Sequence, residues 1–412
     1  MTEGPRHIDL PPEGFEIIDG ELAVAGRSLT AIVAEAGETP LFIYSRDAIQ
    51  RRVAALRAAM PIGLRLHYAI KANPMPEVVS CFAALVDGLD VASAGELSLA
   101  LDCGVSADRV SFAGPGKRND ELKAAVEAGI LINLESTGEM FRLAEIAEAL
   151  GKRPRVAVRV NPLFELRRSG MQMGGGPKPF GVDEEQVPEM LASMAALPLD
   201  FTGFHIFAGS QILDTEGLID CQKATIDLAL RLSQDAPGPV RHVNLGGGFG
   251  IPYFPGDSPI DLGAIGTALG QELDRARSGL PEAAFAIELG RFLIGEAGVY
   301  VTRIVDRKVS RGRTFLVTDG GLHHHLALSG NFGQVLRKNY PVMIGNRAED
   351  VLSETVDIVG CLCTPLDRLG DAVQAPFADV GDLVVAFQSG AYGASASPQK
   401  FLGHPAPREI LV

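Results

Sequence analysis

The sequence lacks the patterns expected of a disulfide-stapled, secreted or membrane-spanning protein. Its five cysteines are too few to staple 412 residues. Their odd number, and the lack of an apolar N-terminal stretch before a cleavage site, predict a reducing compartment. No apolar run reaches the length that a membrane helix needs. We therefore expect a cytoplasmic protein.

Positive charge is also scarce. The 37 lysines and arginines are outnumbered by 51 aspartates and glutamates, which gives a formal charge of −14. This balance disfavours a nucleic-acid partner. No Gly-x-Gly-x-x-Gly follows the first predicted barrel strand, so the chain also lacks the signature of an open dinucleotide-binding sheet.

The central part of the chain alternates short apolar runs with amphipathic helical patterns. Eight runs predict strands: Leu64–Ile70, Gly88–Ala92, Arg109–Ala113, Ile130–Leu134, Arg155–Asn161, Asp200–Phe207, His242–Gly246 and Ala284–Glu288. Eight strand–helix repeats over about 250 residues are typical of a closed parallel (β/α)8 barrel. We assign this α/β barrel to residues 41–292.

The pattern changes after residue 292. Runs rich in Val, Ile and Thr are separated by turn residues, with no long helices between them, at Val299–Val309, Thr314–Val317, Glu354–Val359, Leu383–Phe387 and Glu409–Val412. This pattern of short β-branched runs and turns predicts a mostly antiparallel β domain over residues 293–412. Two short strands within residues 1–40, Phe15–Ile18 and Leu22–Val24, are expected to join it.

Lys71 is the first residue with a predicted chemical role. It closes the apolar run of the first barrel strand, and the Asn-Pro that follows ends this strand. Active sites of such barrels lie at the C-terminal ends of the strands, where Lys71 is expected. A partly desolvated lysine becomes the amine nucleophile that a Schiff base requires. A lysine that merely extends from a strand end into solvent is the structural alternative.

Polar or glycine residues end most of the other predicted barrel strands. They are Asp90 on the second, Arg159 and Asn161 on the fifth, His205 to Gln211 on the sixth, Gly246 to Gly248 on the seventh, and Glu288 with Arg291 on the eighth. Any one of these groups fits a purely structural role. Because the strands share one mouth, we expect them to form one pocket.

Charge and shape indicate what this pocket binds. Glycines 246–248 let backbone amides approach a phosphate, and Arg291 with the Ser210 hydroxyl can complete the cradle. Glu288 is the best candidate for a carboxylate facing a pyridinium nitrogen, which strengthens the ring as an electron sink. A lysine for an aldehyde, a phosphate cradle and this carboxylate together predict a pyridoxal 5'-phosphate (PLP) enzyme.

An ordered series of motifs from Phe42 to Pro407 resembles the barrel-type (fold III) PLP-dependent decarboxylases, the family of ornithine, arginine and diaminopimelate decarboxylases. The series includes Tyr-Ala-Ile-Lys-Ala-Asn, Asp-Val-Ala-Ser-Ala-Gly-Glu-Leu, Gly-Gly-Gly-Phe-Gly, Glu-x-Gly-Arg, a late cysteine and Gly-Ala-Tyr-Gly. The resemblance implies a barrel with a C-terminal β domain, as in alanine racemase and ornithine decarboxylase. It also implies an amino acid decarboxylase.

The resemblance further implies roles for single residues. Lys71 would hold PLP, and Glu288 would meet its ring nitrogen. Cys363 would reach the partner subunit's site in a head-to-tail homodimer and supply the proton that replaces CO2. The other residues expected to bind or border the cofactor are Asp90, Arg159, His205, Phe207, Ser210, Gly247, Gly248, Gly290, Arg291 and Tyr392.

Two departures from the family pattern bear on the substrate. Thr364 follows Cys363 where diaminopimelate decarboxylases usually have Glu and ornithine enzymes Asp, so the acid that recognises the distal ammonium is missing. Asp367 and Tyr392 remain as candidate substrate contacts. Phe207 replaces the histidine that usually stacks on the cofactor ring.

The resulting pattern resembles the exosortase-associated and carrier-protein-linked amino acid decarboxylases. This resemblance implies a carrier-tethered or otherwise non-diamino substrate. Decarboxylation of free diaminopimelate, lysine or ornithine is the alternative. A racemase would need a second base opposite Lys71, and an inactive regulator would be expected to lose the lysine, the cysteine or the phosphate cradle.

Two patterns raise the question of a metal site. Cys361-Leu-Cys363 has no second Cys or His pair at ligand spacing. The three histidines His323–His325 cannot all face one site on a strand. We therefore predict no metal, and we expect the histidines to lie on a polar loop at a domain interface.

Overall fold

The computed structural model describes residues 11–164, 169–172, 174–332, 334 and 337–412. The chain divides into two compact units. The barrel unit comprises Val53–Ile251 and Pro259–Gly290, and the β unit comprises Met1–Arg52, Pro252–Ser258 and Arg291–Val412. The domain limits predicted from the sequence, 1–40, 41–292 and 293–412, stay a prediction that limited proteolysis would test.

Eight parallel strands close the barrel. They are β5 (Arg65–Ala69), β6 (Gly88–Val91), β7 (Val110–Phe112), β8 (Leu131–Leu134), β9 (Arg155–Asn161), β12 (Asp200–Ile206), β14 (His242–Asn244) and β15 (Ala284–Leu289). They pair in the order β9-β12-β14-β15-β5-β6-β7-β8, and pairing of β8 with β9 closes the ring. Short β11 (Val182–Asp183) adds to β9. The predicted closed barrel, with each strand where the sequence placed it, is confirmed.

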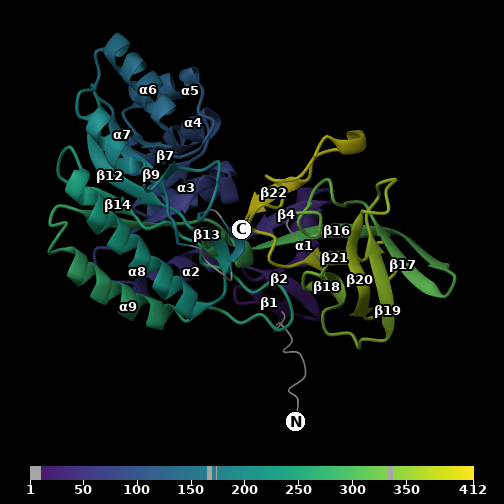
Figure 1. Ribbon diagram of the computed structural model, residues 1–412. Coiled ribbons are helices and arrows are strands. Elements are labelled where there is room, and N and C mark those ends of the chain that lie inside the picture. The colour runs from purple at the N-terminus through teal and green to yellow at the C-terminus, as the bar shows by residue number, and fades with distance from the viewer. Residues whose placement is uncertain (1–10, 165–168, 173, 333, 335–336) are drawn as a thin grey trace. The chain divides into compact units, whose positions relative to one another are not determined.

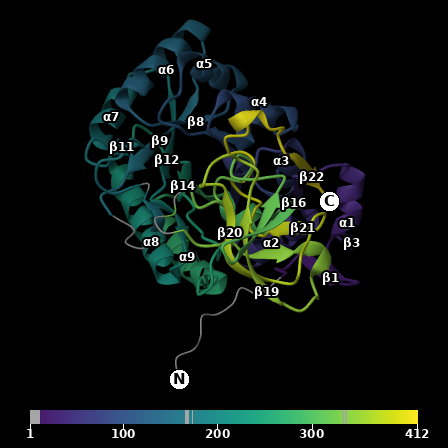
Figure 2. The ribbon, with the colours of Figure 1, turned by 90° about the vertical axis from the view of Figure 1, so that its right-hand side faces the viewer.

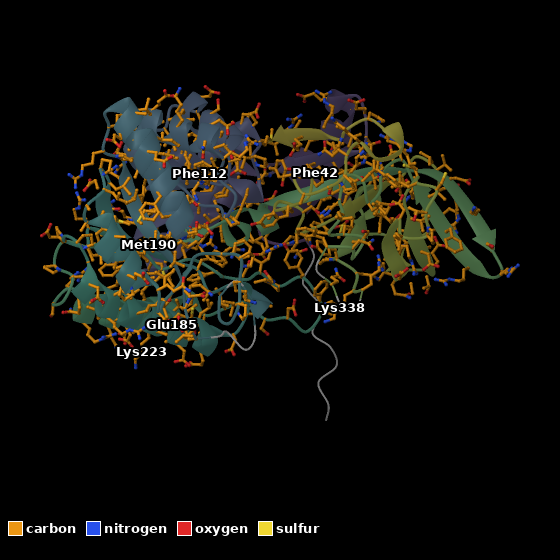
Figure 3. The ribbon with its side chains drawn as sticks, turned by 45° about the horizontal axis from the view of Figure 1, so that its top comes forward. Phe42, Phe112, Glu185, Met190, Lys223 and Lys338 are labelled. Carbon is orange, nitrogen blue, oxygen red and sulfur yellow. The ribbon has the colours of Figure 1, made fainter. Side chains whose placement is uncertain are left out.

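Helices surround the barrel strands, as Figure 1 shows. They are α3 (Pro76–Leu85), α4 (Ala94–Asp102), α5 (Asn119–Ala128), α6 (Thr137–Leu150), α7 (Val187–Met194), α8 (Thr215–Leu232) and α9 (Leu262–Ala276), while α2 (Arg46–Ala59) spans the boundary between the units. Side-chain caps begin several of them: Ser93 accepts the Glu96 amide, and Ser136 accepts the Glu139 amide. The helices cover the strands, so Phe112 at the end of β7 is fully buried. Lys223 of α8, in contrast, lies at the outer surface (Figure 3).

The main sheet of the β unit runs in the order β18-β21-β16-β17-β19-β20, and β4 pairs with both β16 and β22. Its strands are β4 (Leu41–Tyr44), β16 (Gly298–Ser310), β17 (Arg313–Thr318), β18 (Val342–Ile344), β19 (Glu354–Val359), β20 (Arg368–Ala375), β21 (Leu383–Ala386) and β22 (Arg408–Leu411). Among the described strands of the β unit, only the β17–β19 and β4–β22 pairings are parallel. The prediction of a mostly antiparallel β domain is confirmed.

The N-terminal strands form a small sheet of their own. β1 (Phe15–Ile18), β2 (Glu21–Val24) and β3 (Arg27–Ser28) pair in sequence order, and α1 (Leu29–Ala36) lies beside them in Figures 1 and 2. Apolar residues of this segment share one core with the main β sheet, among them Leu22, Leu29, Val299 and Phe387. The small sheet therefore packs on the β unit without extending its main sheet.

Three further elements position residues of the candidate site. β10 (Ser169–Gln172) pairs with β13 (Gly209–Ile212), and the short helix α10 (Arg291–Ile294) follows β15. None of the described helices combines the length and apolar character that crossing a membrane requires.

Candidate active site

Lys71 stands at the C-terminal mouth of the barrel, on the 3-10 turn Ile70–Ala72 that follows β5. Its side chain is exposed, and its ammonium nitrogen lies 5.9 Å from the centre of the Phe207 ring. The expected partial desolvation of Lys71 is not met. The physical reason is local: β5 ends at Ala69, and the turn carries the lysine out of the buried strand.

Local hydrogen bonds and close packing fix the turn that carries Lys71. The Tyr68 hydroxyl donates to the carbonyl oxygen of Asn73 at 2.9 Å. On the other side, a Cβ on Gly290 would lie only 2.9 Å from the Cβ of Ala72. A glycine at position 290 thus lets the chain leaving β15 pass close to the lysine turn.

Glu288 lies on β15, which pairs with β5, and is only 8% exposed. Its Oε2 contacts His205 Nε2 at 2.9 Å and accepts a hydrogen bond from the Asn244 amide at 3.1 Å. Oε1 makes no hydrogen bond to a described residue. Burial would raise the pKa of Glu288, but His205, Lys71 and Arg159 outweigh it and hold the pKa below its usual value. The carboxylate is therefore ionised at neutral pH.

Asp90 is a second buried carboxylate inside the barrel, on β6. Its Oδ1 contacts His67 Nδ1 at 3.2 Å and accepts a short hydrogen bond from the Ser111 hydroxyl. Burial would lower the pKa of His67, but Asp90 outweighs it and raises the pKa. Oδ2 of Asp90 is buried without a hydrogen-bond partner in the described part of the chain.

Arg159 near the end of β9 is buried and forms an ion pair with Glu135 at 2.8 Å. The same carboxylate accepts the amides of Gly114 at 2.6 Å and Gly181 at 3.1 Å. Glu135 was not predicted from the sequence, although its place directly after the fourth barrel strand was an available signal. It neutralises Arg159 and ties three segments of the mouth together.

The glycine run after β14 packs tightly on its neighbours. A Cβ on Gly247 would lie 1.9 Å from the carbonyl oxygen of Glu288, and one on Gly248 would lie 2.7 Å from a carbonyl oxygen of β13. Gly248 also has a positive φ of 86°, which favours glycine. Since β13 carries Ser210, the structure brings this serine and the glycine run into adjacent backbone segments.

Tyrosines enclose Arg291 in the β unit. Its Nη1 donates to the Tyr253 hydroxyl at 2.8 Å, and its guanidinium carbon lies 4.7 Å from the centre of the Tyr392 ring. Tyr340 packs on Tyr253, with 4.8 Å between ring centres. Nε of Arg291 is buried with no hydrogen bond to a described residue. Tyr253 was missed because no spacing in the sequence relates it to Arg291 or Tyr392.

The segment between β19 and β20 carries Cys363, Thr364 and Asp367. Cys363 is exposed and Thr364 is half-buried. Asp367 is only 3% exposed, and its two carboxylate oxygens accept the amides of Leu322 at 2.6 Å and Leu362 at 2.8 Å. Since both oxygens hold backbone segments, the arrangement favours a structural role for Asp367 over the predicted substrate contact.

The histidines at 323–325 lie in a turn of the β unit, and all three are almost completely buried. His324 Nε2 contacts the Pro405 carbonyl at 2.9 Å, and His325 Nε2 contacts the Ser389 hydroxyl at 3.0 Å. The stretch is thus a buried turn with polar contacts, and its expected place at a domain interface stays a prediction.

The predicted site residues thus fall into two groups. The barrel unit carries Lys71, Asp90, Arg159, His205, Phe207, Ser210, Gly247, Gly248, Glu288 and Gly290, on or directly after its strands. The β unit carries Arg291, Cys363, Thr364, Asp367 and Tyr392. Within the β unit, Arg291 contacts Tyr392, and the segment with the cysteine is separate in sequence from both.

Comparison with known proteins gives a consistent result. Residues 46–295 match the family described as "Pyridoxal-dependent decarboxylase, pyridoxal binding domain". The chain is 40% identical to the L-glutamyl-[BtrI acyl-carrier protein] decarboxylase of Niallia circulans, over 91% of this chain and 89% of that protein. It is 32% identical to the diaminopimelate decarboxylase of Aquifex aeolicus, over 97% of this chain and 92% of that protein.

A solved structure supports the fold. The diaminopimelate decarboxylase from M. jannaschii, crystallised with L-lysine, matches with a TM-score of 0.88 at 24% identity, covering 97% of this chain and 93% of that one. The family match spans more than half of the chain, and the two relatives align over nearly all of it. This chain belongs to the barrel-type pyridoxal-dependent decarboxylases and is a PLP-dependent decarboxylase.

Proposed function

We propose that the mouth of the barrel binds PLP, where Lys71 would hold the cofactor through its aldehyde group and Glu288 would face the ring nitrogen. The observation that carries this assignment is the state of Glu288. It is buried and ionised, its Oε2 contacts His205 and Asn244, and the positive charge of Lys71 helps to lower its pKa. An ionised carboxylate keeps a pyridine nitrogen protonated, which this chemistry requires.

Buried polar atoms without partners support a polar ligand in the barrel. Asp90 Oδ2 and His205 Nδ1 are both buried and have no hydrogen bond to a described residue. Leaving such atoms unpaired costs about 1–3 kcal/mol each. The residues assigned to the phosphate are Ser210, Gly247, Gly248, Gly290, Arg291 and Tyr392.

Two further residues complete the proposed mechanism: Phe207 positions the cofactor ring, and Cys363 donates a proton. When bound, PLP would supply an electron sink for the loss of the α-carboxylate. Phe207 offers an apolar face for ring stacking and no proton, so we assign it no acid–base role. The exposed Cys363 thiol donates the proton that replaces CO2 at Cα.

We further propose that the substrate is an amino acid without a free distal ammonium, for instance an aminoacyl group carried by an acyl carrier protein. Thr364 offers no charge, and both oxygens of Asp367 already accept backbone hydrogen bonds. Among its described residues, the segment around Cys363 therefore presents no carboxylate that is free of backbone hydrogen bonds. The name of the N. circulans relative, which acts on a carrier-bound L-glutamyl group, agrees with this inference.

Decarboxylation of a free diamino acid is the second candidate, because the A. aeolicus relative is named a diaminopimelate decarboxylase. We expect Thr364→Glu to raise kcat/KM for meso-diaminopimelate by roughly 30- to 150-fold, since one ion pair in a partly buried site contributes about 2–3 kcal/mol. Thr364→Gln has the same shape without the charge and is the matched control. An equal gain in both variants, or no gain in either, would contradict the role assigned to this position.

We propose a homodimer with shared active sites, in which Cys363 of one chain serves the partner's site. An exposed thiol agrees with such a role. We expect a mixture of inactive Lys71→Ala and Cys363→Ala chains to regain up to about a quarter of wild-type activity, because one site of each heterodimer then holds both native groups. No recovery, despite subunit exchange shown by native mass spectrometry, would mean that Cys363 acts within its own chain.

The five free thiols also agree with a reducing, cytoplasmic location, which we propose for this enzyme.

A further inference from the structure

Three potential metal ligands meet in the β unit from distant parts of the sequence. His323 comes from the turn after β17, Cys361 from the turn after β19, and His404 from the segment before β22. One ligand atom from each lies within 4.8 Å of the others. Cys361 Sγ and His404 Nε2 are 3.9 Å apart, and the rings of His323 and His404 have centres 5.1 Å apart.

The state of His323 indicates that a ligand is missing from this cluster. Its side chain is 0% exposed, and neither ring nitrogen has a hydrogen-bond partner among the described residues. An unpaired buried polar group costs about 1–3 kcal/mol. The two neighbouring histidines, by contrast, both have polar partners. A metal ion would satisfy one nitrogen of His323.

The charge around Cys361 also favours a cation. Its thiol donates to the carbonyl oxygen of Asp319 at 3.6 Å. The carboxylates of Asp367 and Asp319 act electrostatically on the same sulfur, and negative charge of this kind favours a bound cation.

We propose that His323, Cys361 and His404 bind one transition-metal ion with the coordination preferences of Zn²⁺. Two imidazoles and a thiolate are ligands that Zn²⁺ favours, at about 2.0–2.1 Å for nitrogen and about 2.3 Å for sulfur. Tetrahedral ligand atoms are then roughly 3.3–3.6 Å apart, so closing the cluster needs movements of about 1 Å. Three protein ligands leave the fourth position open to water or another donor.

This proposal departs from the sequence-based expectation of no metal. That expectation rested on the lack of a second Cys or His pair near Cys361. The structure supplies the missing ligands from His404, 43 residues further along the chain, and from the turn at His323. A bound metal would link three segments of the β unit and fix the one that carries Cys363.

Metal binding is tested on the PLP-loaded enzyme after dialysis against a chelator. Co²⁺ serves as a spectroscopic probe, and Zn²⁺ affinity is measured by competition with a chromophoric indicator. We expect one ion per chain, visible ligand-field bands for Co²⁺ and a thiolate-to-metal charge-transfer band. Cys361→Ser and His404→Gln should each weaken binding by more than the roughly 10- to 100-fold typical of outer-shell changes.

Matched controls separate this site from other thiols and from misfolding. Cys103→Ser removes a thiol of similar exposure in the barrel unit and should bind as wild type. Neither Cys361 nor His404 is fully buried, so both variants should fold, which circular dichroism checks. Alkylation followed by peptide mass spectrometry adds a test in the wild type: Zn²⁺ should protect Cys361 but not Cys103.

Unchanged metal affinity in both Cys361→Ser and His404→Gln would overturn the proposal, as would the absence of stoichiometric binding to the wild-type enzyme. Both measurements report on binding alone. Their outcome is therefore independent of the proposed substrate and of the proposed roles of Lys71 and Cys363.

Discussion

Replacing Lys71 with alanine is expected to lower kcat by at least about 10³-fold and to abolish covalent retention of PLP. The side chain of Lys71 is exposed, so its loss should change the free energy of unfolding by no more than about 0.5 kcal/mol. Activity assays, and mass spectrometry after borohydride reduction, measure the two effects. The reduced pyridoxyl group should be found on the peptide that contains Lys71.

Two control variants separate the loss of the nucleophilic amine from the loss of positive charge. Lys71→Arg keeps the positive charge near Glu288 but lacks the nucleophilic amine, so it should be as inactive as alanine. Lys123→Ala removes an exposed lysine of α5 and should leave both readouts unchanged. Reduced cofactor found on another lysine, or an active arginine variant, would contradict the assignment of Lys71.

Replacing Glu288 with glutamine is expected to lower kcat by about 10²- to 10³-fold, with a smaller effect on cofactor affinity. The amide keeps the shape of the side chain but loses the charge that holds the ring nitrogen protonated, and preorganised electrostatic groups of this kind typically contribute that much. The cofactor absorbance should also shift, because the ring nitrogen is then neutral. This spectral change would not follow from a purely structural role.

Glu184→Gln is the matched control for Glu288→Gln. Glu184 is also a buried carboxylate of the barrel unit, held by Arg231 at 2.7 Å and by the amide of Leu163 at 2.9 Å. Its neutralisation should lower stability without changing the cofactor spectrum. The assignment of Glu288 would be wrong if both variants lost activity equally and neither changed the absorbance.

The barrel could be predicted because each of its strands carries a local signal. Short apolar runs at regular spacing, each followed by an amphipathic helix, specify parallel strands without knowledge of their partners. β4 was not predicted. Its four residues Leu41–Tyr44 are apolar and buried, but they pair with β16 and β22, more than 250 residues away. The local sequence contains no repeat that indicates pairing with strands so far away.

The candidate site was predictable to a similar degree. Lys71, Glu288 and the glycine run stand at strand ends, where a barrel places its chemistry. Glu135 and Tyr253 were missed because they act through Arg159 and Arg291, which lie far from them in sequence. Partners of this kind emerge only when the chain is folded.

Asp367 illustrates a residue to which the sequence suggests a role that its hydrogen bonds do not favour. Its position four residues after Cys363 suggested a contact with substrate, but a sequence does not reveal which carboxylates the backbone already occupies. In the structure, the amides of Leu322 and Leu362 use both oxygens. This arrangement favours a structural role for Asp367, whereas its contact with substrate stays a prediction.

The most direct test of the account is CO2 release by the wild-type, PLP-loaded enzyme from two substrates measured side by side. One is an L-glutamyl group carried by an acyl carrier protein, and the other is meso-diaminopimelate. The account predicts that kcat/KM for the carrier-bound substrate is higher by at least about 30-fold, the effect of one missing ion pair. Equal or faster turnover of meso-diaminopimelate would contradict it.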